Sequence, residues 1–237
     1  MIKDYTLKNK QNIVLTQDQN EVVEALINNP RFFNCSQTGF GKTITTITAA
    51  VYHYMNNLEE GKDFDYVIVC PTIANRAFIN LFKNIFAIPY NIYTAQNFKE
   101  MKDAKFHIFN YSTLTSNLIK KKKVVNNVPL VEWVDNLQTA TPYIEKLTEL
   151  YKRNPNLHLI LDEAHALQDF KSSQYIVMNS LAPLFKGIWA LTATPVLNDI
   201  EGVFYMTEIV KPQHFKNIYR FRNKYVKTQD VEFWHYN

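Results

Sequence analysis

The stretch Ser36-Gln37-Thr38-Gly39-Phe40-Gly41-Lys42-Thr43 decides the fold of this chain, because these residue types in this order form a phosphate-binding loop. Glycines let backbone N–H groups turn inward around a polyphosphate, the lysine reaches the terminal phosphates, and the threonine hydroxyl can ligate Mg²⁺. Residues 31–35 before the loop have the pattern of a buried strand, and residues 43–56 have the pattern of a helix whose N-terminus faces the anion. The sequence therefore predicts a nucleotide site, whose contacts come from Thr38, Gly39, Phe40, Gly41, Lys42 and Thr43.

The composition is that of a folded, mildly basic protein. The 237 residues are 46% hydrophobic and 14% aromatic, which suffices for one large α/β domain and excludes a disordered chain. A net charge of +4 is compatible with a nucleic-acid partner without requiring one. No apolar run approaches the roughly 18 residues of a membrane span, and no signal region begins the chain. We expect a soluble intracellular protein of the cytoplasm or nucleus, with no membrane partner, in which Cys35 and Cys70 are buried thiols.

Short apolar runs alternate with helical patterns along the chain. Runs that are apolar on both faces are typical of a buried parallel sheet. The alternation predicts a doubly wound, mostly parallel α/β sheet flanked by helices, with its ligand crevice at the carboxyl ends of the strands. The expected strands are residues 32–35, 66–70, 91–93, 106–109, 157–161 and 188–191, and helical patterns cover residues 75–86 and 172–184.

Residues 119–156 interrupt this alternation, and we expect a helical insertion there. A lysine run at 120–123 leads into residues 129–137. Thr141-Pro142 then has the pattern of an N-cap followed by proline at the first helical position, before a helix over residues 143–152. The lysine run fits a solvated loop, and the alternative is a contact with phosphates.

Two acidic residues, Asp162 and Glu163, follow the expected strand at 157–161. In a phosphate-loop ATPase, an Asp in this place can hold Mg²⁺ through its water shell, and the adjacent Glu can orient and deprotonate the attacking water. The alternative is an acidic pair at the start of a helix, where carboxylates interact favourably with the dipole. The phosphate loop in the same chain favours the catalytic interpretation, with ATP and Mg²⁺ as cofactors.

The box Asp162-Glu163-Ala164-His165, taken with three further motifs, resembles the Swi/Snf-like group of superfamily-two helicases. Leu191-Thr192-Ala193-Thr194-Pro195 is similar to the third motif of that group. Cys70-Pro71-Thr72 resembles motif Ia, and Asn110-Tyr111-Ser112-Thr113-Leu114 resembles motif Ib. Chromatin remodellers have glycine in place of Ala193, so the resemblance is to the broad group and not to the remodeller function.

This resemblance implies two facing RecA-like domains with ATP between them and nucleic acid, above all duplex DNA, across both. Residues 1–210 would form the N-terminal RecA-like domain. Residues 211–237 would begin the connection to a second RecA-like domain, which is absent from this chain and would act in cis or in trans. That domain would supply arginines that stabilise charge on the transferred phosphoryl group. The aromatic residues between 215 and 234 belong either to the connection or to the first domain.

The implied function is a DNA-dependent ATPase that couples ATP hydrolysis to movement along duplex DNA. Two alternatives stay open, an RNA helicase of the Asp-Glu-x-His type and a nucleotide-binding regulatory module without turnover. The resemblance implies Lys42, Asp162 and Glu163 as catalytic residues, and Thr43 and Asp162 as Mg²⁺ ligands.

The remaining roles also come from the resemblance, and each has a structural alternative. Gln19 matches the glutamine that reads the adenine edge, and Thr16-x-x-Gln19 is at the same time a capping box. His165 would couple the nucleotide cleft to the nucleic-acid face together with Thr192 and Thr194; the alternatives are a helix-start histidine and hydroxyls that cap a turn. The implied contacts with the sugar-phosphate backbone are Pro71, Thr72, Arg76 and Tyr111, and Arg76 is equally compatible with a solvated helix position.

Overall fold

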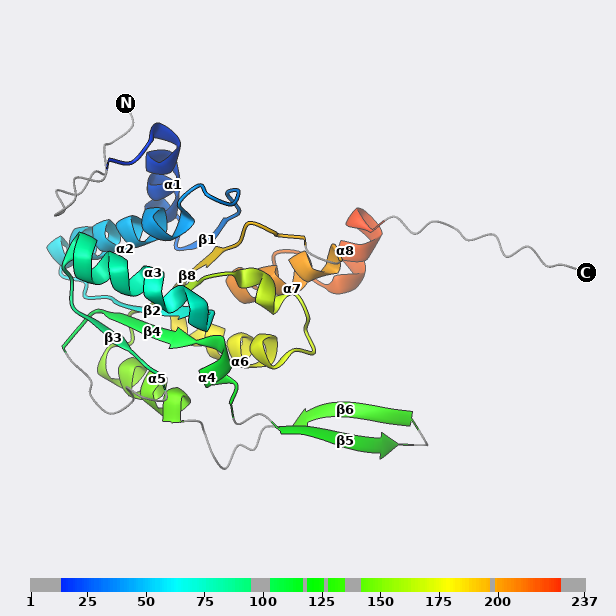
Figure 1. Cartoon of the computed structure of the whole chain (residues 1–237). Helices are drawn as coiled ribbons and strands as arrows, with labels where there is room; N and C mark the ends of the chain where they lie inside the picture. The colour runs from blue at the N-terminus through cyan, green and yellow to red at the C-terminus, as the bar shows by residue number, and fades with distance from the viewer. Residues whose placement is uncertain are drawn as a thin grey trace, which may run out of the picture.

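The computed structural model describes residues 14–94, 103–116, 119–125, 128–134, 142–196 and 199–226. Its centre is a sheet in which six described strands pair in parallel throughout, in the order β1-β8-β7-β2-β4-β3 (Figure 1). Parallel neighbours require crossover connections, which helices supply here. The strands are β1 (Arg31–Asn34), β2 (Asp65–Cys70), β3 (Tyr90–Ile92), β4 (Phe106–Asn110), β7 (Leu157–Leu161) and β8 (Phe185–Leu191).

Helices cover both faces of this sheet, with α1, α2 and α3 on one face and α5 and α6 on the other (Figure 1). Short helical turns occur at several strand ends, and α3 continues directly into the π-helical turn η2. The helices are α1 (Gln17–Asn28), α2 (Lys42–Glu59), α3 (Asn75–Asn80), η2 (Leu81–Phe86), α4 (Tyr111–Leu114), α5 (Pro142–Arg153), α6 (Ser173–Leu181), α7 (Glu201–Val210) and α8 (Ile218–Tyr225), with 3-10 turns η1 (Thr72–Ala74), η3 (Ala164–Leu167) and η4 (Ala182–Leu184).

Two hydrophobic cores lie on opposite faces of the sheet. Side chains alternate between the faces along β2, because successive residues of a strand point to opposite sides. Tyr66 and Ile68 pack into the core beneath α1, α2 and α3. Val67 and Val69 pack into the core beneath α5 and α6. The apolar runs therefore have both faces buried, and the predicted doubly wound, parallel α/β fold is confirmed.

The expected helical insertion at 119–156 is helical only in its second part. Strands β5 (Ile119–Val125) and β6 (Val128–Val134) pair as an antiparallel hairpin, from Ile119 opposite Val134 to Val125 opposite Val128. Five valines occupy this stretch, and β-branched residues favour strands over helices. The lysine run thus lies in a strand, whereas α5 agrees with the helix expected at 143–152. Thr141 lies outside the described residues.

The structure also shows the burial of the two cysteines and the packing of the C-terminal aromatic residues. Cys70 is buried as expected, but Cys35 is exposed, because it lies just after β1 where the chain leaves the sheet; both are free thiols. Among the C-terminal aromatic residues, Phe221 is buried and packs against Phe204 of α7, with Phe215 against both rings. Phe215 and Phe221 therefore pack on the same domain as α7, and Trp234 lies outside the described residues. No helix in the described part of the chain is long and apolar enough to cross a membrane.

Candidate active site

The phosphate-binding loop lies between the end of β1 and the start of α2, and two glycines shape it. Gly39 has φ 83° and Gly41 has φ 89°, a left-handed conformation that glycine adopts without steric cost. A Cβ atom on Gly41 would also lie 2.9 Å from Nε2 of Gln19. Gly41 is the N-cap of α2, so the loop brings backbone N–H groups and the helix N-terminus to one place. Thr38 is exposed in this loop, and Thr43 is partly buried in the first turn of α2.

The Lys42 ammonium group is held within the loop itself. Its Nζ donates to the carbonyl oxygens of Ser36 at 2.9 Å and Gln37 at 3.2 Å. Ser36 is in turn anchored to β1, because its Oγ donates to Oδ1 of Asn34 at 2.6 Å and its backbone N–H to the same oxygen at 3.2 Å. The loop is thus already folded around the Lys42 ammonium group, and a polyphosphate bound in the loop would contact that group.

Gln19 ties helix α1 to the phosphate-binding loop. The backbone N–H of Thr16 donates to Oε1 of Gln19 at 2.9 Å, and the backbone N–H of Gln19 donates to the Thr16 hydroxyl at 3.3 Å, so the capping box is present. Nε2 of Gln19 donates to the carbonyl of Phe40 at 2.8 Å. A primary amide has two N–H donors and two acceptor lone pairs. The Gln19 amide can therefore make these two bonds and still offer one N–H and one lone pair to an adenine.

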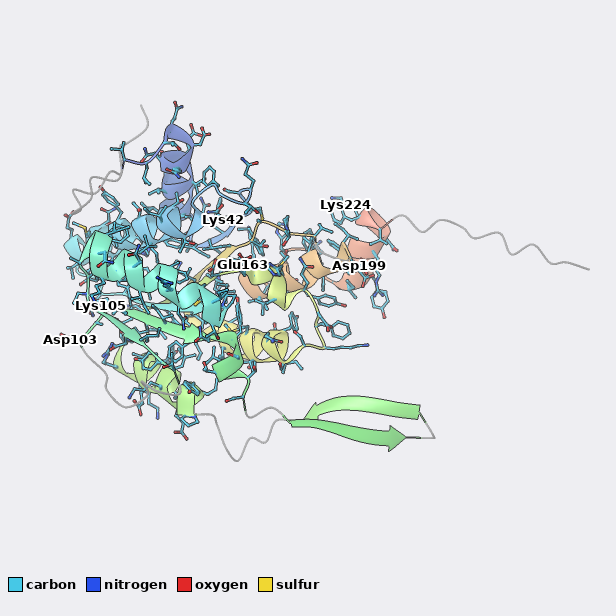
Figure 2. The ribbon with its side chains drawn as sticks, in the orientation of Figure 1. Lys42, Asp103, Lys105, Glu163, Asp199 and Lys224 are labelled. Carbon is cyan, nitrogen blue, oxygen red and sulfur yellow. The ribbon has the colours of Figure 1, made fainter. Side chains whose placement is uncertain are left out.

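Asp162 lies directly after β7, at the same end of the sheet as the loop. Its backbone N–H donates to the carbonyl of Val69 at 2.9 Å, and its side chain is 7% exposed. Burial and the neighbouring Glu163 carboxylate raise the pKa of Asp162 to about 6, while the Lys42 ammonium lowers it. The Lys42 ammonium and the Asp162 carboxylate therefore interact electrostatically. Figure 2 labels Lys42 and Glu163, which appear in the same part of the view.

Glu163 turns away from the strand by a left-handed backbone conformation. Its φ is 50° and its ψ is 50°, which is uncommon for a residue with a Cβ and costs free energy. This conformation ends β7 and sends the side chain, 43% exposed, toward His165, whose Nδ1 lies 3.2 Å from Oε2 of Glu163. Backbone strain of this kind clusters at functional sites.

His165 joins the acidic box to the loop after β8. Its Nδ1 lies 3.4 Å from the Thr192 hydroxyl, which accepts from the backbone N–H of Thr194 at 3.1 Å. The backbone N–H of Thr192 donates to the carbonyl of Asn34 at 3.1 Å, so this loop is also tied to β1. The structure thus brings together two separate motifs, with Glu163 and His165 from the acidic box and Thr192 and Thr194 from the loop after β8.

The turns after β2 and β4 lie side by side at the same end of the sheet. Pro71 is the N-cap of η1, and the exposed Thr72 hydroxyl lies 3.4 Å from that of Ser112. Beneath them, Nδ2 of Asn110 donates to Oδ1 of Asn75 at 2.7 Å, and Nδ2 of Asn75 donates to Oδ1 of Asn110 at 3.1 Å. This reciprocal pair fixes the two turns relative to each other. Arg76, in the first turn of α3, is exposed.

The side chain of Tyr111 points into the core. Its side chain is 5% exposed, and its hydroxyl donates to the backbone carbonyl of Asp162 at 3.1 Å. Burial raises its pKa well above the ordinary value. A side-chain contact between Tyr111 and a sugar-phosphate backbone is therefore incompatible with this packing, and the neighbouring Ser112 takes the exposed position.

Three residues at this end of the sheet escaped the sequence analysis. Ser112 lies within Asn110-Tyr111-Ser112-Thr113-Leu114, and the motif does not show which of its side chains is exposed. Asn34 ends an apolar strand with a polar side chain, which was a signal that could have been used. Gln168 contacts the Thr194-Pro195 backbone, and no sequence rule places a glutamine against a loop 26 residues away.

The residues near the loop fit a nucleotide-bound Mg²⁺ better than a free-standing metal centre. Within the described residues, no group of three or more His, Cys, Asp or Glu side chains could hold a metal ion. Mg²⁺ keeps several waters and is bound through one or two carboxylates together with substrate phosphates. The Thr43 hydroxyl and the Asp162 carboxylate are a donor set of that kind.

Comparison with known proteins identifies the family of this chain and solved structures with a similar fold. The SNF2-related domain family matches residues 32–232. The uncharacterized ATP-dependent helicase YqhH of Bacillus subtilis is 34% identical over 71 residues, which are 30% of this chain and 12% of that protein. This chain is similar to the Sulfolobus solfataricus SWI2/SNF2 ATPase core in complex with dsDNA over 94% of its length, with a TM-score of 0.64 and 16% identity.

The SWI2/SNF2 ATPase core domain of Sulfolobus solfataricus, solved alone, gives the same result, with a TM-score of 0.60 and 15% identity over 94% of this chain. The chain covers 40% and 39% of these two solved structures. At this level of identity the likeness establishes the fold alone, and this chain spans well under half of the proteins that it matches.

Proposed function

The chain belongs to the SNF2-related domain family as a Swi/Snf-like, helicase-type ATPase domain, and on this premise we propose that it is the ATP-binding half of a motor that moves along duplex DNA. One observation supports this most directly. The phosphate loop, the Asp162-Glu163 pair and the Thr192 loop meet at one end of the sheet, and His165 contacts both Glu163 and Thr192. A site that only binds nucleotide has no need of this connection.

In the proposed site, Lys42 exchanges the carbonyls of Ser36 and Gln37 for the β- and γ-phosphates of ATP. The exchange is favourable because charge-assisted hydrogen bonds to phosphate are stronger than those to neutral carbonyls. Thr43 and Asp162 would hold Mg²⁺, Asp162 through water, and the bound ion neutralises charge on the phosphates. Gln19 would read the adenine edge while keeping its bond to the loop.

Glu163 is the proposed general base. Its carboxylate is 43% exposed, and His165 fixes its direction through the 3.2 Å contact. A carboxylate held in this way can orient a water molecule and accept its proton, which is worth about 10²-fold to 10⁴-fold in rate. Asp162 is less suited to this step because it is 7% exposed, so an attacking water has less access to it than to the Glu163 carboxylate.

Nucleic acid would lie across the turns after β2 and β4. Pro71, Thr72 and Arg76 are proposed to contact the sugar-phosphate backbone, with Ser112 in place of Tyr111. His165, Thr192 and Thr194 would couple this face to the nucleotide. Duplex DNA is the favoured partner because one similar solved structure is a SWI2/SNF2 ATPase core in complex with dsDNA. A second RecA-like domain, in cis or in trans, would complete the cleft and supply arginines.

The test measures ATP turnover by this chain with and without duplex DNA, alongside direct nucleotide binding. The expected result is binding with little turnover, and DNA-stimulated turnover once a second RecA-like domain is supplied. Stimulation by RNA but not by DNA would replace the proposal with an RNA helicase. Tight binding with no turnover under any pairing would replace it with a regulatory module.

A further inference from the structure

Gln168 lies one 3-10 turn after His165. Its backbone N–H donates to the His165 carbonyl at 3.2 Å, and residues three apart in a 3-10 helix lie in line on the same side. The two side chains therefore reach the same neighbouring segment, the loop after β8. His165 contacts this loop at Thr192, and Gln168 contacts it two and three residues further on.

The side-chain amide of Gln168 binds two successive carbonyls of that loop. Its Nε2 lies 3.2 Å from the carbonyl oxygen of Thr194 and 3.0 Å from that of Pro195. A primary amide has two N–H donors, so one nitrogen can satisfy both acceptors. These bonds are shorter than the 3.4 Å contact between His165 and Thr192, so Gln168 makes the closer attachment between the acidic box and the loop.

The loop depends on such side chains because it has left the sheet. The backbone N–H of Thr194 binds the Thr192 hydroxyl, and Pro195 has no N–H to offer. Within the described residues, the Thr194 and Pro195 carbonyls accept hydrogen bonds from Gln168. Loss of these donors would leave two backbone acceptors without their protein partner.

The stem of Gln168 is also packed against helix α7. A Cβ atom on Gly202 would lie 2.8 Å from Cβ, 2.9 Å from Cγ and 3.0 Å from Cδ of Gln168. The helix can approach this closely because residue 202 is glycine. Gln168 therefore contacts the loop after β8 and the second residue of α7, while its own backbone continues the turn that carries His165.

We propose that Gln168 is a positioning residue that holds the Thr194-Pro195 loop to the Asp162-Glu163 box, so that nucleic acid bound near the loop controls the geometry of Glu163. This inference rests on the proposed function. Substitution of Gln168 leaves the residues of the phosphate loop themselves unchanged, so we expect nucleotide affinity to be retained.

Three substitutions separate hydrogen bonding from packing. Gln168→Met keeps an unbranched side chain of similar length against Gly202 but removes both N–H donors. Gln168→Lys restores N–H donors on an unbranched stem. Gln174→Met makes the same chemical change in α6, away from the loop, and serves as the control.

The first measurement is amide hydrogen exchange at Thr194, whose N–H donates to the Thr192 hydroxyl within the loop that Gln168 holds, in this chain without nucleic acid. Gln168→Met should exchange about tenfold to thirtyfold faster than wild type, as two hydrogen bonds imply, and Gln168→Lys should recover at least part of the protection. Equal exchange in wild type and Gln168→Met overturns the inference, whatever the nucleic acid does.

The second measurement is the DNA-stimulated turnover of this chain together with a second RecA-like domain. For Gln168→Met we expect kcat to fall by about tenfold to thirtyfold, the factor expected for amide exchange, with KM for ATP unchanged. Gln168→Lys should restore part of the lost turnover. Equal losses in both variants would assign the effect to packing and overturn the inference. A wild-type protein that no nucleic acid stimulates would instead refute the proposed function, and the exchange experiment would still decide the placement of the loop.

Discussion

The hydroxyl of Tyr111 donates a 3.1 Å hydrogen bond to the backbone carbonyl of Asp162. Tyr111 begins α4 after β4, and Asp162 follows β7, with β2 between these two strands in the sheet. The bond therefore spans a strand and joins the turn proposed to face nucleic acid to the backbone of the residue whose carboxylate is proposed to hold Mg²⁺. A nucleic acid that shifts the turn after β4 would act directly on the backbone of the acidic box.

Tyr111→Phe should destabilise the fold by about 1–2 kcal/mol, because it leaves a buried carbonyl without its donor. Nucleotide affinity should be retained, since the ring still fills its place in the core. Urea unfolding of the two proteins measures the difference. Tyr219→Phe, at a position that is 72% exposed, is the matched control and should be neutral. Equal stability of Tyr111→Phe and wild type would show that the bond contributes nothing net.

Lys42→Ala should weaken ATP binding by about tenfold to a hundredfold, the value of one charged hydrogen-bonding group. The fold should survive, because the lysine binds only carbonyls of its own loop in the described contacts. Calorimetric titration with ATP measures the affinity, and circular dichroism checks the fold. Lys186→Ala, at an exposed position of β8, should bind as wild type. Undiminished binding by Lys42→Ala would place the phosphates elsewhere.

Glu163→Gln should retain ATP binding and lose about 10²-fold to 10⁴-fold in turnover, because an amide cannot accept the proton of the attacking water. Steady-state phosphate release by this chain, paired with a second RecA-like domain and duplex DNA as proposed, is the appropriate assay. Glu149→Gln, with a side chain that is 59% exposed on α5, makes the same change away from the site. Unchanged turnover in Glu163→Gln would remove Glu163 as the base.

Asp162→Asn should stabilise the nucleotide-free protein at pH 7.5 by about 1–3 kcal/mol. Burial and Glu163 raise the pKa of Asp162 from 3.8 to about 6, so the folded state binds this proton more tightly than the unfolded state. The stability that the proton contributes is complete below pH 3.8 and is lost as pH rises through 6. Replacement by Asn removes the buried charge and this dependence together.

Urea unfolding at several pH values between 3.5 and 7.5 tests this prediction for Asp162. The difference between wild type and Asp162→Asn should grow across roughly pH 4 to 6 and then level off. Asp103→Asn, at an exposed position (Figure 2), should show no such growth. A difference that is constant with pH would mean that Asp162 is not the titrating group.

Gly187→Ala should destabilise the fold by about 1–3 kcal/mol through overpacking. An added Cβ atom would overlap the ring of His158 and lie 2.7 Å from the carbonyl oxygen of Pro30. The ring cannot swing aside, because it is buried against Trp189 with ring centroids 4.1 Å apart. Thermal unfolding measures the loss, and Lys186→Ala on the same strand is the control. An unchanged melting temperature would show that the strand yields freely here.

Most of the sheet was predictable because buried parallel strands are apolar on both faces, as in Asp65–Cys70 and Leu157–Leu161. The hairpin Ile119–Val134 was missed because a lysine-rich strand has neither a continuous apolar run nor a clear alternation, and its pairing depends on a second strand. The burial of the Tyr111 side chain was not predictable, because its motif shows its position in the chain but not its packing.

The sequence by itself determined the phosphate-binding loop and the acidic box, because the chemistry of each lies within eight or fewer neighbouring residues. The tertiary structure alone decided the contacts between these segments. Gln19 binds a carbonyl 21 residues away, Gln168 one that is 26 residues away, and Tyr111 one that is 51 residues away. These distances along the chain carry no local pattern, because a parallel sheet gathers the carboxyl ends of its strands at one edge whatever the length of chain between them.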